Sequence, residues 1–240
     1  MDKAALVTGG SSGIGLSIAT MLHEEGFALT LAARTSAKVA AAAEALGAHA
    51  VAADVAQEKD CRRILDEHRE RHGRLDVLVN SAGVGVGGLV DELDTKPIDL
   101  QLDVNLRGTI LVTAAALPLL REARGLIVNI ASIAGTSPSA RLPVYGAAKA
   151  GVINFTASLN RGEEEHGVRA TALSPGFVDT PMTDWAPVPK ERMIRAEDCA
   201  EVVRALLRLS PYARLPHIVL ERANPKFSTH RPTLTPRAGG

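Results

Sequence analysis

The chain has 240 residues, enough for one large α/β domain with a sizeable buried core. Its 27 basic and 27 acidic residues balance, so no net field attracts nucleic acid or an anionic membrane, and we expect a small-molecule partner. The two isolated cysteines, Cys61 and Cys199, argue against a disulfide framework or a cysteine metal site and favour a reducing, cytoplasmic location.

Short apolar segments of β-type composition alternate with longer helical patterns along the chain. This alternation predicts βαβ units, and therefore a Rossmann-type, doubly wound parallel sheet covered by helices on both faces: a three-layer α/β fold in a single domain. Seven strands are expected, at 4–8, 28–33, 48–53, 75–80, 125–131, 168–173 and 217–220.

Glycines mark the expected helix ends. The first helix is expected to end near Gly26, and Gly47 and Gly73 stand where helix C-caps are expected. The apolar stretch 109–120 is too short to span a bilayer, and no signal-like run precedes the first glycines, so we expect an untargeted protein. The domain is expected to cover 1–221, with a loosely ordered tail at 222–240.

A glycine-rich segment, TGGSSGIG at 8–15, lies between the first strand and the first helix. Backbone N–H groups and the helix N-terminus can meet a pyrophosphate there without side-chain obstruction. The spacing of Gly9, Gly13 and Gly15 differs from the G-x-G-x-x-G fingerprint of ordinary dinucleotide folds. The segment predicts a dinucleotide phosphate site, and an ordinary glycine-rich turn is the alternative.

The end of the second strand bears on the choice of cofactor. An NAD enzyme is expected to have a carboxylate there for the ribose hydroxyls, but Ala33 occupies that place. Arg34, Thr35 and Ser36 instead offer a guanidinium and hydroxyls suited to a 2′-phosphate. We therefore expect NADP(H) to be preferred, with NAD(H) possible, unless Arg34 merely stacks on the adenine.

Tyr145 and Lys149 stand four residues apart in a predicted helix, so they share a face. A neighbouring ammonium and the oxidised nicotinamide both favour the phenolate, so Lys149 is expected to bring the pKa of Tyr145 from about 10 into a working range. Tyr145 is then the expected acid and base of a carbonyl–alcohol interconversion. Ser132 ends an apolar strand, where its hydroxyl can hold the substrate oxygen.

Together these motifs resemble the short-chain dehydrogenase/reductase family over residues 4 to about 180. The matches are TGxxxGIG at 8–15, NSAG at 80–83 in place of NAAG, Asn105, Ser132 thirteen residues before Tyr145, and YxxxK at 145–149. The resemblance implies four catalytic residues, Asn105, Ser132, Tyr145 and Lys149, with Asn105 supporting a proton relay. It also implies a homodimer or homotetramer in which the helices carrying Asn105 and Tyr145 pair across a twofold axis.

The resemblance also implies a set of cofactor contacts. Asp54 and Val55 would lie near the adenine, and the segment after the sixth strand would border the nicotinamide. The expected contacts are Gly9, Ser11, Ser12, Gly13, Ile14, Gly15, Arg34, Thr35, Asp54, Val55, Asn80, Ala82, Gly83, Tyr145, Lys149, Pro175, Gly176, Val178 and Thr180.

Substrate identity is expected to depend on residues 180–196, where members of the family carry a lid. Met182 and Trp185 suggest an apolar cover and a small or mostly apolar substrate, such as a hydroxy acid or keto acid or a 3-oxoacyl compound. Arg192 and Arg195 could instead receive an anionic group, with surface solvation as the alternative. The rival functions are a non-catalytic NAD(P)-sensing regulatory protein and an epimerase or dehydratase of the extended branch, whose glycine spacing differs.

Two further clusters have simpler explanations than a site. His68 and His72 share a helical face, but no third ligand is near in sequence, so no metal site is expected. The run Glu163-Glu164-Glu165 is expected to form a solvated face near a helix end.

Overall fold

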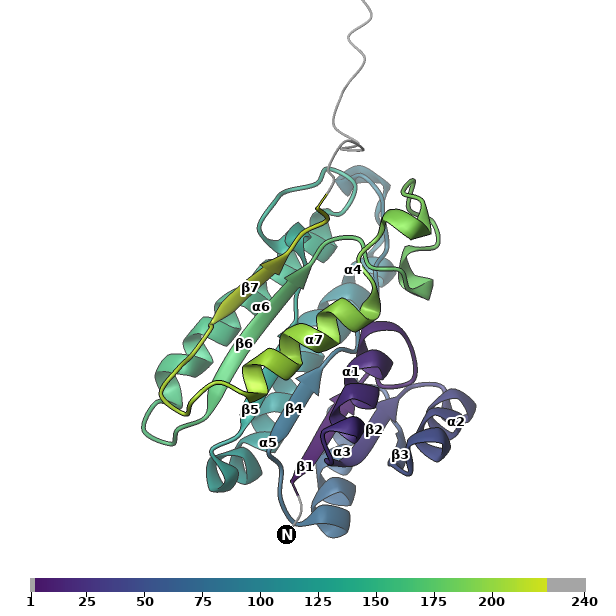
Figure 1. Ribbon diagram of the computed structural model, residues 1–240. Coiled ribbons are helices and arrows are strands. Elements are labelled where there is room, and N and C mark those ends of the chain that lie inside the picture. Colours follow the sequence, from purple (N-terminus) through teal and green to yellow (C-terminus); the bar gives the residue numbers. More distant parts are fainter. Residues whose placement is uncertain (1–2, 224–240) are drawn as a thin grey trace, which may run out of the picture.

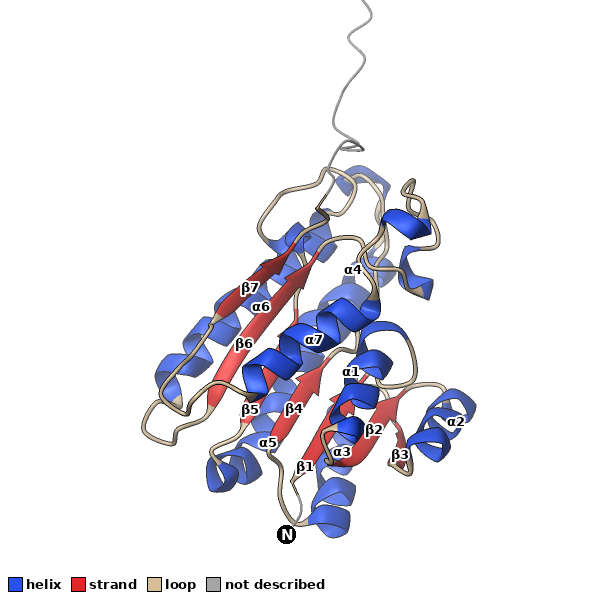
Figure 2. Cartoon of the chain, in the orientation of Figure 1, coloured by secondary structure: helices blue, strands red, loops and turns tan. Residues whose placement is uncertain are grey.

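Seven parallel strands form one sheet, in the order β3-β2-β1-β4-β5-β6-β7, in the computed structural model, which describes residues 3–223 (Figure 1 and Figure 2). All seven predicted strands are confirmed, with ends within two residues of those expected. They are β1 Ala4–Thr8, β2 Ala28–Ala33, β3 His49–Ala52, β4 Val77–Asn80, β5 Leu126–Ile130, β6 Arg169–Pro175 and β7 His217–Leu220. Most of the predicted tail lies outside the described residues.

Helices cover both faces of the sheet, which gives the predicted three layers. The α-helices are α1 Gly13–Glu24, α2 Ser36–Leu46, α3 Glu58–His72, α4 Thr95–Leu102, α5 Gly108–Ala123, α6 Pro143–Gly162 and α7 Ala196–Leu207. Shorter helical turns are η1 Val90–Glu92, η2 Asp103–Arg107, η3 Ile133–Gly135, η4 Pro181–Thr183 and η5 Lys190–Arg192. Helix α1 ends near Gly26, and Gly47 and Gly73 cap α2 and α3 in the left-handed conformation, as predicted.

The alternation of side chains along each strand divides the interior into two apolar cores. In β1, Ala5 and Val7 pack in one core with residues of α1, α2 and α7, whereas Leu6 packs in the other with residues of α3 and α5. Both faces of the strand are therefore covered, so all five residues of β1 are buried. A sheet buried on both faces requires the continuous apolar strands that the sequence contains.

The apolar stretch 109–120 is part of a longer continuous helix. Residues Thr95–Ala123 run through α4, the π-helical turn η2 and α5, and are long and apolar enough to cross a membrane by length and composition. In the fold, however, Val112, Ala116 and Leu120 of α5 lie in the core beneath the sheet. This stretch is thus a core helix, whose apolar character follows from packing.

Contrary to the prediction from the sequence, the three glutamates that follow α6 are not all exposed to solvent. Glu164 and Glu165 are exposed, but Glu163 is 5% exposed and pairs with Arg121 of α5 through two hydrogen bonds of 2.8 and 2.7 Å. The prediction was wrong for Glu163 because α5 lies beside the end of α6, a tertiary contact that local charge patterning does not reveal. The pair ties the end of α6, which carries Tyr145 and Lys149, to the end of α5, which continues the turn that carries Asn105.

We expect Glu163→Gln to lower the urea midpoint of unfolding at pH 7, because glutamine cannot replace the ion pair. The Arg121 guanidinium holds the pKa of the Glu163 carboxyl below its ordinary value of 4.5. A carboxyl with a lowered folded pKa contributes stability above its unfolded pKa and loses it as the pH falls through the folded value. The difference between the variant and the wild-type protein should therefore shrink as the pH drops below 4.5.

Urea titrations at a series of pH values measure this effect, with Glu164→Gln as the matched control at an exposed neighbour. A pH-independent loss in Glu163→Gln, or an equal loss in both variants, would contradict the assignment to the ion pair.

Candidate active site

Parallel strands end at the same edge of the sheet, and the predicted site residues gather there. The glycine-rich segment follows β1, the Asn80–Gly83 segment follows β4, Ser132 follows β5 and Gly176 follows β6. The strand order places β1 beside β4, with Thr8 opposite Asn80, at the point where the chain reverses its direction of winding. Ligands of open α/β sheets bind at such switch points.

The glycines let the β1–α1 loop approach the β4 loop. Gly9 has φ +67°, and a Cβ there would lie 2.8 Å from the backbone nitrogen of Ala82. A Cβ on Gly15 would meet the carbonyl oxygen of Gly9. Thr8, which the sequence analysis did not single out, fixes this approach, because its hydroxyl oxygen accepts hydrogen bonds from Ser81 N (3.2 Å) and Ala82 N (3.3 Å).

The start of α1 offers unsatisfied donors to an anion. The first bond of the helix joins Leu16 N to Ser12 O, so the N–H groups of Gly13, Ile14 and Gly15 have no partner within the helix. Ser12 does not cap them with its side chain, Ser11 lies just before it in the same loop, and the first turn holds no acidic residue. Backbone N–H groups and the helix dipole thus suit the pyrophosphate of a dinucleotide.

Asn80 is held by a buried polar network rather than by solvent. Its Nδ2 donates to Thr113 Oγ1 and to Asn129 Oδ1, each at 2.9 Å, and Asn129 Nδ2 donates to Thr156 Oγ1 at 2.9 Å. The Oδ1 of Asn80 has no hydrogen-bond partner in the described part of the chain. The network links β4 and β5 to α5 and α6, and so fixes the strand from which Ala82 and Gly83 extend.

Asn105 lies on the π-helical turn η2 and is fully buried. Its amide clasps the backbone of Val84: Nδ2 donates to Val84 O at 2.8 Å, and Oδ1 accepts from Val84 N at 3.0 Å. A Cβ on Gly83 would lie 3.0 Å from Asn105 Oδ1 and 3.7 Å from Lys149 Nζ. The structure therefore places Asn105, Gly83 and Lys149 together, with the Asn105 amide committed to positioning the β4 loop.

Ser132 and Tyr145 meet because the turn after β5 packs tightly on α6. The Ser132 side chain interacts with the Tyr145 phenol and favours its ionised form, which opposes the rise in the pKa of Tyr145. The hydroxyl oxygen of Ser132 accepts a hydrogen bond from Ala134 N at 3.1 Å. Two glycines that the sequence analysis missed allow this contact. A Cβ on Gly146 would lie 2.8 Å from Ala134 O, and one on Gly135 would lie 2.8 Å from Ala150 N. Their positions, directly after Tyr145 and three residues after Ser132, were the available signal.

Lys149 is almost completely buried beneath Tyr145. Its Nζ donates to Ile130 O at 2.8 Å and lies 5.6 Å from the centroid of the Tyr145 ring. Burial lowers the pKa of Lys149 to about 8, so the ammonium form still predominates at pH 7. The structure brings the predicted pair together on one helix face.

The pKa of Tyr145 shifts upwards, opposite to the expected direction. Burial raises it above the ordinary phenol value, and the interaction with Ser132 only partly opposes this effect. The expectation considered the charge of Lys149 but not the removal of the phenol from water, which disfavours the phenolate. The protein's own groups therefore keep Tyr145 in its protonated form.

The segment after β6 joins the substrate end of the site to the glycine-rich loop. Gly176 N, just after Pro175, donates to Leu220 O at 2.9 Å, and Val178 pairs with Ile194. Thr180 lies against the loop, since a Cβ on Gly13 would be 3.1 Å from Thr180 Cγ2.

The lid residues lie beside this segment. Met182 reaches over Gly83, because its Cε would be 3.8 Å from a Cβ there. Trp185 is 63% exposed and packs edge-on against Phe177 at 6.2 Å between ring centroids. Arg195, by contrast, pairs with Asp198 at 2.7 Å and caps α7, so the expectation that it receives an external anion is not supported.

The residues expected around the adenosine also lie at this edge. Arg34 and Thr35 are exposed just after β2, and Thr35 makes no side-chain cap to α2. Asp54 follows β3, and its Oδ1 accepts from Ala56 N at 3.0 Å. Val55 is buried and lines a small cavity with Thr8 and Ala82.

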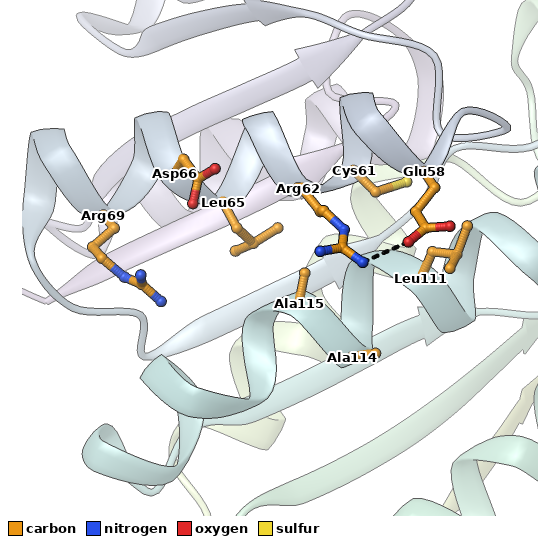
Figure 3. Close-up of a pocket in the computed structure, with 9 residues that line it drawn as sticks. All are labelled: Glu58, Cys61, Arg62, Leu65, Asp66, Arg69, Leu111, Ala114 and Ala115. Atoms are coloured by element: carbon orange, nitrogen blue, oxygen red, sulfur yellow. Dashed lines mark hydrogen bonds and ion pairs between the residues drawn. The ribbon is translucent and has the colours of Figure 1, made fainter.

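A groove of about 420 Å³ between α3 and α5 lies away from these residues (Figure 3). Its lining includes the Arg62–Glu58 ion pair and Ala115, and none of the predicted site residues. The two histidines of α3 also lie outside the site. His68 is buried between Thr30 Oγ1 and Arg74 O, each at 2.9 Å, and no group of metal-binding side chains is found within residues 3–223.

Comparison with known proteins agrees with this geometry. The family model described as short chain dehydrogenase matches residues 3–188. An uncharacterized oxidoreductase of Staphylococcus epidermidis is 36% identical over 205 residues, which cover 84% of this chain and 89% of that protein. One from Staphylococcus saprophyticus is 37% identical over 194 residues, with coverages of 77% and 83%. The X-ray structure of an alcohol dehydrogenase from the archaeon Thermococcus sibiricus, complexed with 5-hydroxy-NADP, matches with a TM-score of 0.83 at 28% identity over 92% of this chain and 96% of that one.

We expect Gly15→Ala to destabilise the protein by about 1–3 kcal/mol, because the added methyl group meets the Gly9 carbonyl and must displace the loop. Urea denaturation measures this loss. Gly162→Ala is the matched control, since a Cβ at the end of α6 meets nothing within 4 Å. It should leave stability unchanged or raise it by up to about 1 kcal/mol. Equal stability of the two variants would contradict the tight packing of the loop.

Proposed function

This chain belongs to the short-chain dehydrogenase/reductase family and is an oxidoreductase of that family, and from this premise we propose that it interconverts a carbonyl and a secondary alcohol with NADP(H). The observation that carries the proposal is the placement of the Ser132 hydroxyl and the buried Lys149 ammonium beside the Tyr145 ring. These three side chains stand at the sheet edge where the glycine-rich loop offers its donors. A cofactor and a substrate can therefore meet there.

The roles of the side chains follow from their contacts. The nicotinamide ring, when bound, supplies or accepts the hydride. Ser132 Oγ accepts from Ala134 N, which orients the hydroxyl, and its hydrogen would turn to the substrate oxygen when a substrate is bound. Tyr145, protonated in the protein, donates its phenol proton to that oxygen as negative charge develops during reduction, and takes the proton back during oxidation.

Lys149 and Asn105 support the proton donor. Lys149, with a pKa of about 8, is mainly charged at pH 7 and favours the phenolate that remains after proton transfer. Asn105 is a positioning residue through its clasp on Val84. The proton relay through Asn105 that the family resemblance implies stays a prediction.

The preference for NADP(H) rests on Arg34. Its guanidinium lies exposed directly after β2, next to the hydroxyls of Thr35 and Ser36, and no carboxylate stands at position 33. The alcohol dehydrogenase that matches this fold was crystallised with an NADP derivative, which is consistent with the same choice here. A 2′-phosphate at this edge would receive charge-assisted hydrogen bonds.

A cytoplasmic homodimer or homotetramer remains our proposal for the assembled enzyme. Leu100, Leu102 and Ile110 are exposed along the helix that carries Asn105, and they offer an apolar surface for pairing.

We expect Tyr145→Phe to lower kcat for carbonyl reduction by roughly 10²- to 10⁴-fold, because the proton donor is lost while the ring is kept. NADPH oxidation against a panel of keto acids, diketones, aldehydes and 3-oxoacyl thioesters measures this. Tyr212→Phe is the control, since Tyr212 is the other tyrosine of the chain and is 97% exposed. NADPH binding without turnover of any panel member would favour the regulatory sensor instead.

Arg34→Gln should weaken NADPH binding by roughly 10- to 100-fold, because a charge-assisted hydrogen bond to the 2′-phosphate is removed. NADH binding should stay within about twofold, since NADH lacks that phosphate. Titration with both cofactors checks this, with Arg161→Gln as a control at an exposed arginine near the far end of α6. Equal weakening of both cofactors would assign Arg34 to adenine stacking.

A further inference from the structure

The side chain of Phe177 lies between two residues from distant parts of the chain. The guanidinium carbon of Arg222 is 5.8 Å from the centroid of the Phe177 ring, and Trp185 packs edge-on against the same ring. Arg222 follows β7, Phe177 follows β6, and Trp185 belongs to the segment between Thr180 and Ala196. We call Phe177, Trp185 and Arg222 the Phe177 cluster.

The cluster lies at the substrate end of the candidate site. The residue before Phe177, Gly176, faces Ile133, since a Cβ there would lie 3.5 Å from Ile133 Cδ1. Ile133 directly follows Ser132. The hydrogen bond from Gly176 N to Leu220 O holds the end of β7, and with it Arg222, beside the segment after β6. The cluster thus lies at the same end of the sheet as Ser132, at the segments that follow β6 and β7, while Thr180 lies against the glycine-rich loop.

Arg222 differs from the other half-buried arginines in having no anionic or carbonyl partner among residues 3–223. Arg63, Arg74 and Arg204 pair with carboxylates, and Arg169 donates to two backbone carbonyls. Within residues 3–223, the contact found for the Arg222 guanidinium is the one with the Phe177 ring. An arginine that lies on an aromatic ring keeps the N–H groups at its edge free, and two of them match the oxygens of a carboxylate.

Other cations of the neighbouring segment are already committed. Lys190 pairs with Asp184 at 2.8 Å and with Asp179 at 3.4 Å, and Arg195 pairs with Asp198. The acidic partners reduce the attraction of Lys190 and Arg195 for an incoming anion, whereas no ion pair of this kind is found for Arg222 in the described part of the chain.

We propose that Arg222 binds the carboxylate of the substrate and thereby selects oxo acids and hydroxy acids over neutral carbonyl compounds. The inference rests on the proposed oxidoreductase function, because it names the substrate class of the same site. Phe177 and Trp185 supply apolar walls beside the carboxylate, and Phe177 holds the guanidinium plane. Arg222 is thus a specificity-determining residue contributed by the segment after the last strand.

The first test compares straight-chain 2-oxo to 5-oxo acids with their methyl esters in NADPH oxidation. The series varies the distance from ketone to carboxylate, and the esters remove the charge. Arg222→Gln should lower kcat/KM for the preferred oxo acid by roughly 10- to 100-fold and leave its ester within about threefold. Arg222→Lys should recover only part of the loss, because an ammonium lacks the planar pair of donors.

Arg195→Gln is the matched control, since it removes the same charge from an exposed pair near the lid. It should leave the preference for oxo acids intact. An equal loss on acids and esters in Arg222→Gln would make Arg222 only a tether for the end of the chain, and an unchanged preference would mean that it does not contact the substrate. Either result overturns the proposal.

A binding measurement separates this proposal from the proposed function. Trp185 is the single tryptophan of the chain, so its fluorescence reports on the Phe177 cluster. Oxo acids titrated into the protein with NADP⁺, which cannot reduce them, should change this fluorescence saturably, and the change should be absent in Arg222→Gln. Saturable binding without turnover in the first test would sustain the carboxylate site and reject the oxidoreductase function. Turnover of esters without oxo-acid binding would sustain the oxidoreductase function and reject the carboxylate site. The absence of both binding and turnover would overturn both proposals.

Discussion

The adjacency of β1 and β4 is the constraint on which the rest of the site depends. At this point of the sheet the loops after the two strands lie in contact, and the hydroxyl of Thr8 holds the start of the β4 loop against the glycine-rich loop. Gly9 and Gly15 are required because any side chain there would occupy the contact itself. The donors of α1 and the Gly83 backbone are thereby held at one edge, where a dinucleotide can bridge them.

The side chains that we propose transfer the proton depend on a second close contact, between the turn after β5 and α6. Gly135 and Gly146 let this turn approach the helix backbone, so that Ser132 reaches Tyr145. Lys149 is buried at the same contact, although burying an ammonium is unfavourable and lowers its pKa. A buried ammonium with one backbone hydrogen bond reduces the stability of the fold. Ionisable groups buried at such a cost are typical of functional sites, which agrees with the role that we propose for Lys149.

Beyond the proposed catalytic residues, the edge of the sheet is formed by segments from the C-terminal part of the chain, after β6 and after β7. The end of β7 is held to the segment after β6, and that segment carries Phe177 between the lid and Arg222. The proposed substrate contacts therefore come from the second half of the chain, whereas the proposed cofactor contacts are spread from the glycine-rich loop to Thr180, as suits a fold that accepts varied substrates by varying its last loops.

The sequence by itself determined the seven strands, the helix caps and the family to which the chain belongs, because strand periodicity, glycine caps and motif spacing are local properties. Only the tertiary structure decided what depends on neighbours distant in sequence. Folding buries Glu163 against Arg121, and the burial of Tyr145 raises the pKa of its phenol instead of lowering it. Folding also pairs Arg195 with Asp198, whereas it brings the guanidinium of Arg222 near the Phe177 ring. Burial and pairing are set by elements that meet only after folding, and these two quantities govern the energy of every charged group.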